Sequence, residues 1–372
     1  MMQFVDLNQQ YFLIKEAINK NVQAVLDHGQ FITGPEVIEL EKRLSEWISV
    51  RHCVTVSNGT MALLIALMAL GIGSGDEVIT SSFSFFATAE IITFLGAKPI
   101  FIDIDPFTYN IDVSQIEVAI TNQTKAIVPV SLFGQCADLT SINAIAKRHG
   151  LFVIEDGAQS LGAIHQGKQS CSLTTIGCTS FFPSKPLGCY GDGGACFTND
   201  DDLAETMRLI RNHGQKNHYN HVRIGLNARF NTLQAAVLLA KLERFSDELK
   251  RRQIVANWYS EILQGHFTIP YVASENVSVF AQYTIRVKER EAIRAALSKV
   301  GIPTAVHYPK PLHEQPAMQD YLREQRWDCP QAKMASQQVL SLPFHPYLAN
   351  EIVRKICNEL LGIVHHQRVS IK

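Results

Sequence analysis

Helical and strand patterns alternate along this chain from about residue 35 to residue 200. Helical spacing of apolar residues covers 36–48, 62–70 and 87–95, and short strand patterns cover 53–56, 77–81, 98–104 and 125–130. Such alternation predicts an α/β fold, with a mainly parallel, twisted sheet and helices on both faces. In such a sheet the carboxyl ends of the strands face the ligand crevice, so residues that follow strands are the first candidates for chemistry.

A long helical pattern over 232–261 leads into a second region. That region has a strand pattern at 283–287 and amphipathic stretches at 290–300 and 350–361. A chain of 372 residues with 46% hydrophobic residues has enough material for two cores. We therefore predict a large domain over residues 1–245 and a small C-terminal domain over residues 246–372.

Lys185 stands between an apolar strand pattern over 174–182 and a turn rich in glycine, 188–194. A lysine that loses contact with water there loses part of its preference for the ammonium form, so a nucleophilic amine becomes accessible near neutral pH. Such an amine forms a Schiff base with an aldehyde. The alternative is that Lys185 ends the strand and pairs with a carboxylate.

Asp156 ends another apolar strand pattern, which begins at residue 151. A carboxylate at a strand end can bind a metal, act as a base or hold a ring nitrogen protonated, and it can also simply cap the next helix. No cluster of His, Cys and Asp with ligand spacing accompanies it, which disfavours a metal site.

The turn Ser57-Asn58-Gly59-Thr60 joins a strand pattern to a helix pattern. Free backbone N–H groups and the positive end of the helix would suit an anion such as phosphate. The turn matches neither established glycine-rich phosphate motif, and an ordinary helix N-cap would look the same. Together, an anion cradle, a strand-end acid and a strand-end lysine are the set that holds a phosphorylated pyridine aldehyde.

Several separated motifs then resemble, in the same order, those of a known family. They are FVDL at 4–7, GPEV at 34–37, EDGAQ at 155–159, SKPLG at 184–188 and VHYP at 306–309. This pattern resembles the DegT/DnrJ/EryC1/StrS family of sugar aminotransferases, which depend on pyridoxal 5'-phosphate. The resemblance implies the fold-type I architecture, similar to that of aspartate aminotransferase.

The resemblance also implies roles for individual residues. Lys185 would form the Schiff base with the cofactor, Asp156 would partner its ring nitrogen, and Gln159 would bond its phenolic oxygen. The phosphate would be bound by Gly59, Thr60, Ser180 and, from the neighbouring subunit, Asn227. Phe85 would stack on the ring, although an aromatic residue in the run 83–86 is more often part of the core. Active sites shared in this way imply a homodimer.

Two positions depart from the usual family pattern: Gly157 replaces the usual alanine and Ser84 the usual threonine. Neither change removes a functional group that the cofactor needs. A related branch that carries out dehydration has histidine in place of the lysine, so Lys185 favours transamination. We expect L-glutamate as the amino donor, 2-oxoglutarate as its product, and Lys185 as the base that moves the proton.

The segments 127–138, 180–194, 281–284 and 303–308 resemble those of aminotransferases acting on UDP-2-acetamido-2-deoxy-3-oxo-D-glucuronate. Those enzymes serve the synthesis of bacterial surface polysaccharide such as O-antigen. The resemblance implies a cation for the sugar carboxylate, and Arg229 is the candidate because its planar fork suits a carboxylate. His307 and Tyr308 would line the sugar site, although a lone histidine is more often structural.

Other functions remain open at this point. One is transfer to another 3- or 4-keto nucleotide sugar. A regulator that binds the cofactor without catalysis would gain nothing from keeping Asp156, Gln159 and Lys185 together. An aminotransferase or lyase acting on amino acids would use an arginine of the small domain to bind the substrate carboxylate. Arg286 is the candidate residue under that hypothesis.

The overall composition excludes some partners. A net charge of −1 gives no excess of positive charge with which to bind nucleic acid. The eight cysteines form no C-x-x-C pair, which is typical of reduced thiols in the cytoplasm. The sequence has no secretory leader pattern and no apolar run of membrane-spanning length, so we expect a soluble cytoplasmic protein.

Overall fold

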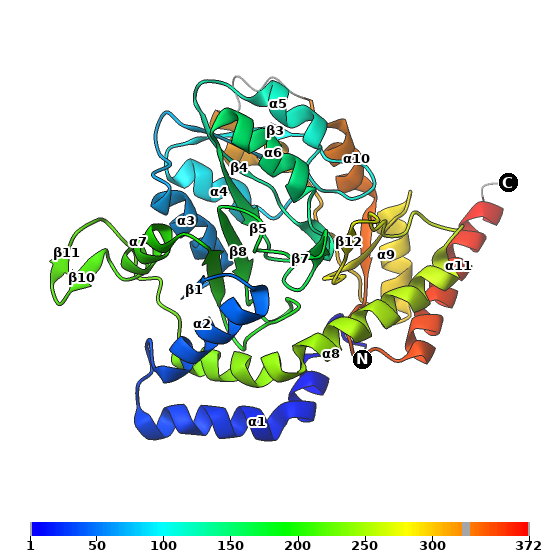
Figure 1. Cartoon of the computed structure of the whole chain (residues 1–372). Coiled ribbons are helices and arrows are strands. Elements are labelled where there is room, and N and C mark those ends of the chain that lie inside the picture. Colours follow the sequence, from blue (N-terminus) through cyan, green and yellow to red (C-terminus); the bar gives the residue numbers. More distant parts are fainter. Residues whose placement is uncertain (1, 322–327, 371–372) are drawn as a thin grey trace.

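A seven-stranded sheet forms the centre of the computed structural model, which describes residues 2–321 and 328–370 (Figure 1). The strand order is β1-β9-β8-β5-β4-β2-β3. Strand β9 is antiparallel to both of its neighbours, whereas the pairs from β8 to β3 are parallel, which confirms the predicted fold class. The strands are β1 His52–Val56, β2 Glu77–Ser81, β3 Lys98–Ile102, β4 Thr124–Val128, β5 Phe152–Asp156, β8 Ile176–Ser180 and β9 Gly194–Thr198.

Successive residues of the central strands enter two different hydrophobic cores. Ile154 of β5 packs in the core that contains α3 (Gly59–Ala69), whereas Val153 packs in the core that contains α6 (Leu139–His149). Because side chains alternate across a strand, a sheet covered on both faces needs apolar residues at every position. This explains the continuous apolar runs in the sequence. Further helices around the sheet are α2 Pro35–Ile48, α4 Ala87–Phe94, α5 Ile116–Ala119 and α7 Asp201–Arg211.

The long helix α8, Thr232–Leu263, connects this sheet to a second core (Figure 1). Phe245 packs with α2 and the sheet, and Val255 packs in the second core. The second core lies among β13 Tyr283–Arg286, β14 Val339–Leu342, α9 Arg290–Lys299 and α11 Asn350–Ser370. The division of the chain at residue 245 stays a prediction.

Four predicted strands end one or two residues earlier in the structure than the sequence pattern suggested; β8 ends at Ser180 and β13 at Arg286. β4 stops at Val128, because Pro129 has no N–H with which to continue the ladder, although Val130 still bridges to Asp156. β3 stops at Ile102, and Ile104 forms an isolated bridge with Ile111.

Some elements had no expectation from the sequence. Helix α1, Leu7–His28, lies along α8, and the hairpin of β10 Gln215–Asn217 and β11 Asn220–His221 projects from the body (Figure 1). Others are β6 Ile164–His165, β7 Lys168–Gln169, β12 Asn276–Val277, α10 Pro330–Gln338, and the 3-10 turns Val113–Gln115, Leu132–Gly134, Leu312–Glu314 and Pro316–Tyr321. Across 2–321 and 328–370, no helix combines the length and apolarity that crossing a membrane requires.

Candidate active site

A cavity of about 490 Å³ collects most of the residues that the sequence singled out. It lies where β5 ends at Asp156 and β8 ends at Ser180, beside the start of α3. Its lining includes Gly59, Thr60, Phe85, Asp156, Gln159, Ser180, Lys185, His307 and Tyr308. The rule that ligands bind at the carboxyl ends of parallel strands therefore located the cavity correctly.

The start of α3 forms a tight cradle against the end of β8 and the start of β9. A Cβ on Gly59 would lie 2.7 Å from the Cβ of Ser180, and one on Gly194 would lie 2.5 Å from the carbonyl carbon of Asn58. The Asn58 side chain caps the helix by accepting from the N–H of Met61 at 2.8 Å. The first N–H groups of the helix, which have no partner within it, remain for an anion.

Ser180 completes this cradle from the sheet side. Its Oγ accepts from the N–H of Phe182 at 3.2 Å and donates to none of the described residues, which leaves its hydroxyl proton for a ligand acceptor. A helix N-terminus without side-chain bulk, facing a hydroxyl donor, fits a phosphate group.

Asp156 is 5% exposed at the floor of the cavity. Thr88 donates to its Oδ2 at 2.7 Å, and the N–H of Ala158 donates to its Oδ1 at 3.2 Å. Burial raises the pKa of Asp156, while these two bonds and the charge of Lys185 oppose the rise. Two hydrogen bonds compensate only part of the cost of burying this negative charge, so the carboxylate suits a cationic partner such as a protonated ring nitrogen.

Gln159 connects the cavity to two other segments. Its Oε1 accepts from the N–H of Phe133 at 2.9 Å, and its Nε2 donates to the Tyr308 hydroxyl at 3.0 Å. A carboxamide nitrogen carries two protons, so one remains for a ligand oxygen. Burial raises the pKa of Tyr308, which therefore stays protonated at neutral pH.

Lys185 is held by the tight loop that follows β8. The N–H of Lys185 donates to the carbonyl of Phe182 at 2.9 Å, and buried Lys241 donates to the carbonyl of Gly188 at 2.6 Å. A Cβ on Gly188 would lie 2.5 Å from the Pro183 carbonyl oxygen, so this position needs glycine. Burial lowers the pKa of Lys185, while the charge of Asp156 acts in the opposite direction. The neutral amine required of a nucleophile is thus made more accessible.

Phe85 and His307 complete the walls. Phe85 is 57% exposed and its ring centroid lies 6.1 Å from that of Tyr308, whereas Phe83 of the same run is fully buried. The interpretation of Phe85 as a core residue is therefore wrong. The His307 Nδ1 lies 2.9 Å from the Ser341 Oγ, and burial, with a smaller contribution from Lys185, lowers the pKa of His307 to about 4.

Asn227 and Arg229 lie outside the lining of this cavity within the described part of the chain. Asn227 is exposed and its backbone bridges to Asn212, whose Oδ1 accepts from the Arg229 Nη1 at 3.0 Å. The Arg229 Nε is buried without a hydrogen-bond partner among the described residues. Their predicted roles across a subunit interface stay predictions.

The two departures from the usual family pattern have local explanations. A Cβ on Gly157 would lie 2.5 Å from the Sγ of Cys171, so glycine makes room for that thiol. The Ser84 Oγ lies 3.3 Å from the Thr88 Oγ1, which in turn bonds to Asp156. Ser84 therefore supports the carboxylate through Thr88.

Comparison with known proteins agrees with this geometry. The family model described as the DegT/DnrJ/EryC1/StrS aminotransferase family matches residues 13–361. The chain belongs to this aminotransferase family. Its identification from the sequence motifs is confirmed.

The chain is 54% identical, over 97% of its length and 99% of the relative's, to the UDP-2-acetamido-2-deoxy-3-oxo-D-glucuronate aminotransferase of Pseudomonas aeruginosa. Among solved structures it is similar to a DegT DnrJ EryC1 StrS aminotransferase from Brucella abortus, with a TM-score of 0.94, 43% identity and 97% and 99% of the two chains covered. It is also similar to the PLP form of a putative sugar aminotransferase from Streptococcus pneumoniae, with a TM-score of 0.89, 27% identity and 94% and 96% covered.

Members of this family use pyridoxal 5'-phosphate, as predicted, and the cavity residues fit it. The cradle suits the phosphate, the buried carboxylate suits the ring nitrogen, and the partly buried amine suits the aldehyde. Sequence reasoning gave no role to Thr88 or Gln282, which also belong to the site, and it named Asn58 only as part of the turn before α3. The cap that Asn58 forms agrees with the preference for asparagine at this position.

Proposed function

We propose that this aminotransferase moves an amino group from L-glutamate to C3 of UDP-2-acetamido-2-deoxy-3-oxo-D-glucuronate. The similarity to the Pseudomonas aeruginosa enzyme extends over nearly the full length of both chains, and this observation carries the proposal. The cavity supports it, because the predicted cofactor-binding residues other than Asn227 line one space together with the proposed sugar-site residues His307 and Tyr308.

An enzyme specific for amino acids is less well supported. The candidate arginine for that function, Arg286, donates to the Pro106 carbonyl at 3.4 Å and lies 5.9 Å from the ring of Tyr109. It is not part of the cavity lining in the described residues. A regulator without catalysis would not need the lowered pKa of Lys185.

Bound pyridoxal phosphate supplies an aldehyde that bonds to amines and a ring that accepts negative charge from the carbon losing its proton. Lys185 would hold the cofactor through its Nζ, and the same amine, when free, would carry a proton between the reacting carbons. The Asp156 carboxylate would keep the ring nitrogen protonated, and the Thr88 hydroxyl holds that carboxylate in place. Gln159 would orient the ring through its second amide proton.

We extend the proposal to a homodimer in which Asn227 and Arg229 enter the partner's site. Large apolar side chains stand exposed on α1 and beside the projecting hairpin: Phe12 at 70%, Leu13 at 52%, Tyr219 at 82% and Ile224 at 85%. Exposed apolar surface of this kind is typical of an interface, and two-fold symmetry would use it twice. In that arrangement Arg229 would meet the sugar carboxylate in the partner's cavity.

The proposed location is the cytoplasm and the proposed pathway is the synthesis of bacterial surface polysaccharide. All eight cysteines are buried free thiols, as is usual in a reducing compartment. The pathway follows from the proposed substrate.

Isotope transfer tests the proposed function. The purified protein would be incubated with ¹⁵N-labelled L-glutamate and the 3-oxo UDP-sugar acid, and the nucleotide sugar would be analysed by mass spectrometry. We expect label in the sugar, accompanied by release of 2-oxoglutarate. Label entering a 4-keto nucleotide sugar, but not the 3-oxo acid, would contradict the assignment of the substrate.

A further inference from the structure

Gln282 lies between the cofactor cavity and a second, smaller cavity. Among the described residues it is the one that lines both. Its carboxamide oxygen is buried and accepts no hydrogen bond from any described residue. A buried acceptor without a donor is unfavourable, and most such atoms in proteins find a partner. At the wall of a substrate cavity, the missing donor is expected on the ligand.

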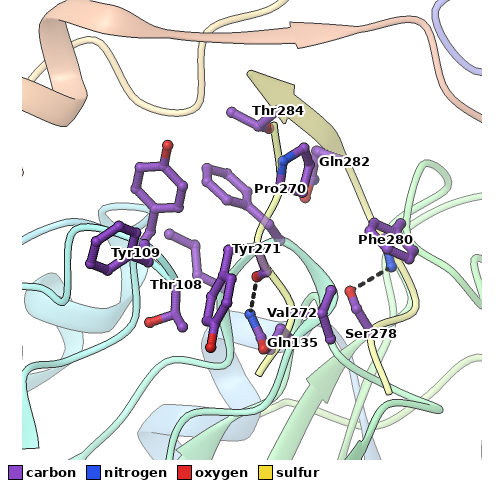
Figure 2. Close-up of a pocket in the computed structure, with 13 residues that line it drawn as sticks. Thr108, Tyr109, Gln135, Pro270, Tyr271, Val272, Ser278, Phe280, Gln282 and Thr284 are labelled. Atoms are coloured by element: carbon purple, nitrogen blue, oxygen red, sulfur yellow. Dashed lines mark hydrogen bonds between the residues drawn. The ribbon is translucent and has the colours of Figure 1, made fainter. Parts of the chain in front are cut away.

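The second cavity is small, and its lining includes several aromatic side chains (Figure 2). Its volume of about 20 Å³ leaves space for one group of the size of a water molecule or a methyl. Tyr109, Tyr271 and Phe280 lie around it, and the bond from the Gln135 Nε2 to the Tyr271 carbonyl, 2.9 Å, fixes one wall.

The backbone around this second cavity is strained at three residues. Tyr109, Phe133 and Phe280 have φ angles of 62°, 56° and 45°, in the left-handed region that large side chains rarely adopt. Such strain persists where the surrounding structure imposes it, and it is concentrated at ligand sites. Phe133 is also the residue whose N–H holds Gln159, so the walls of the two cavities are directly connected.

The proposed substrate has a group that matches both features. Its acetamido group sits on C2, next to the C3 that must reach Lys185, so the group has to enter the same cavity. An acetamido group carries one N–H donor and one methyl. A hydroxyl at C2 offers a donor but nothing to fill the second cavity.

We propose that Gln282 recognises the 2-acetamido group of the sugar: its Oε1 accepts the acetamido N–H, and the acetyl methyl occupies the second cavity. This makes Gln282 a specificity-determining residue, and the inference rests on the proposed function. Selectivity for an N-acetylated sugar over its hydroxyl counterpart follows, because the wrong substrate leaves the second cavity unfilled.

Calorimetric binding to the holoenzyme tests this with two ligands that differ at C2. UDP-2-acetamido-2-deoxy-D-glucuronate and UDP-glucuronate share the nucleotide and the carboxylate, and neither has a ketone to react. We expect Gln282→Leu to weaken binding of the acetamido ligand by about 10-fold or more, the usual effect of removing a buried hydrogen-bond partner. Binding of UDP-glucuronate should change by less than about 3-fold, because its C2 hydroxyl can rotate and donate to water instead, whereas the acetamido N–H is fixed by the acetyl group in the second cavity.

A second variant tests the smaller cavity without touching the amide. Val272→Ile adds one methylene to a partly buried lining residue. It should weaken binding of the acetamido ligand more than binding of UDP-glucuronate. The matched control is Gln337→Leu, the same change at an exposed position of α10, which should alter neither affinity. The spectral change on adding L-glutamate, which requires no sugar, should persist in all variants.

The outcomes separate this inference from the proposed function. If the wild type binds both ligands but Gln282→Leu and Val272→Ile change the two affinities equally or not at all, Gln282 does not read the acetamido group. That result would leave the second cavity as a water site. If the wild type binds neither ligand, the proposed substrate itself is wrong.

Discussion

Replacement of Gly59 by alanine tests the phosphate cradle directly. The added Cβ would lie 2.7 Å from the Ser180 Cβ and 3.2 Å from its Oγ, whereas ordinary contacts begin near 3.4 Å. Ser180 must therefore move by about 0.7 Å, and overpacking of this kind costs about 1–3 kcal/mol. Because Ser180 is also proposed to donate a hydrogen bond to the cofactor phosphate, we expect most of this free-energy cost to appear as weaker cofactor binding. The dissociation constant for pyridoxal phosphate should rise by roughly 5- to 150-fold.

The assay is titration of the cofactor-free protein with pyridoxal phosphate, followed by visible absorbance. Gly73→Ala is the matched control, because its Cβ would have one neighbour, 3.9 Å away, and the residue does not need a positive φ. In a Ser180→Gly background the Gly59→Ala penalty should largely disappear, since the clashing Cβ is gone. An unchanged affinity in Gly59→Ala, or the same penalty with and without the Ser180 side chain, would refute the reasoning.

Three further outcomes are expected. Borohydride should fix the cofactor to the peptide containing Lys185 in the wild type but not in Lys185→Ala, whose transfer activity should be lost; covalent attachment elsewhere, seen by peptide mass spectrometry, would contradict this. Asp156→Asn should lower turnover by several orders of magnitude. Burial raises the pKa of Asp156, so the cofactor-free wild type loses stability as pH rises through that pKa. The melting temperature of Asp156→Asn relative to that of the wild type should therefore increase above about pH 4. A difference in melting temperature that stays constant with pH would count against this. Mixed subunits of Lys185→Ala and Arg229→Ala should recover about a quarter of the wild-type site activity, because each heterodimer keeps one intact site; exchange without recovery would place Arg229 in its own chain's site.

The sequence was sufficient for the parts of the site that depend on local pattern. Asp156 follows an apolar strand and Lys185 precedes a glycine-rich turn, and both features are visible within a few residues. Because parallel strands present their carboxyl ends at one edge, these separate signals could be combined into one site without coordinates.

Other contributions depend on contacts between distant segments. Thr88 reaches Asp156 across 68 positions of sequence, and nothing in its own helix distinguishes it from a core residue. Gln282 is notable for a missing hydrogen bond, which no sequence pattern reveals. The early end of β4 at Val128 was predictable from Pro129, whereas the antiparallel orientation of β9 depends on the path of the preceding loop.

The close packing of Gly157 against Cys171 restricts the order in which these positions can have changed during evolution. With a Cβ at 157 placed 2.5 Å from the thiol sulfur, alanine and cysteine do not fit together. A lineage that starts from the alanine usual in the family therefore has to acquire glycine at 157, or to shift the Cys171 side chain, before it can hold the thiol in this position. Returning alanine to this chain should cost less stability after Cys171→Gly than before it, although the Cβ would still lie 3.1 Å from the Cys178 carbonyl oxygen and 3.2 Å from the Ser170 Oγ. The two positions are therefore expected to covary among its relatives.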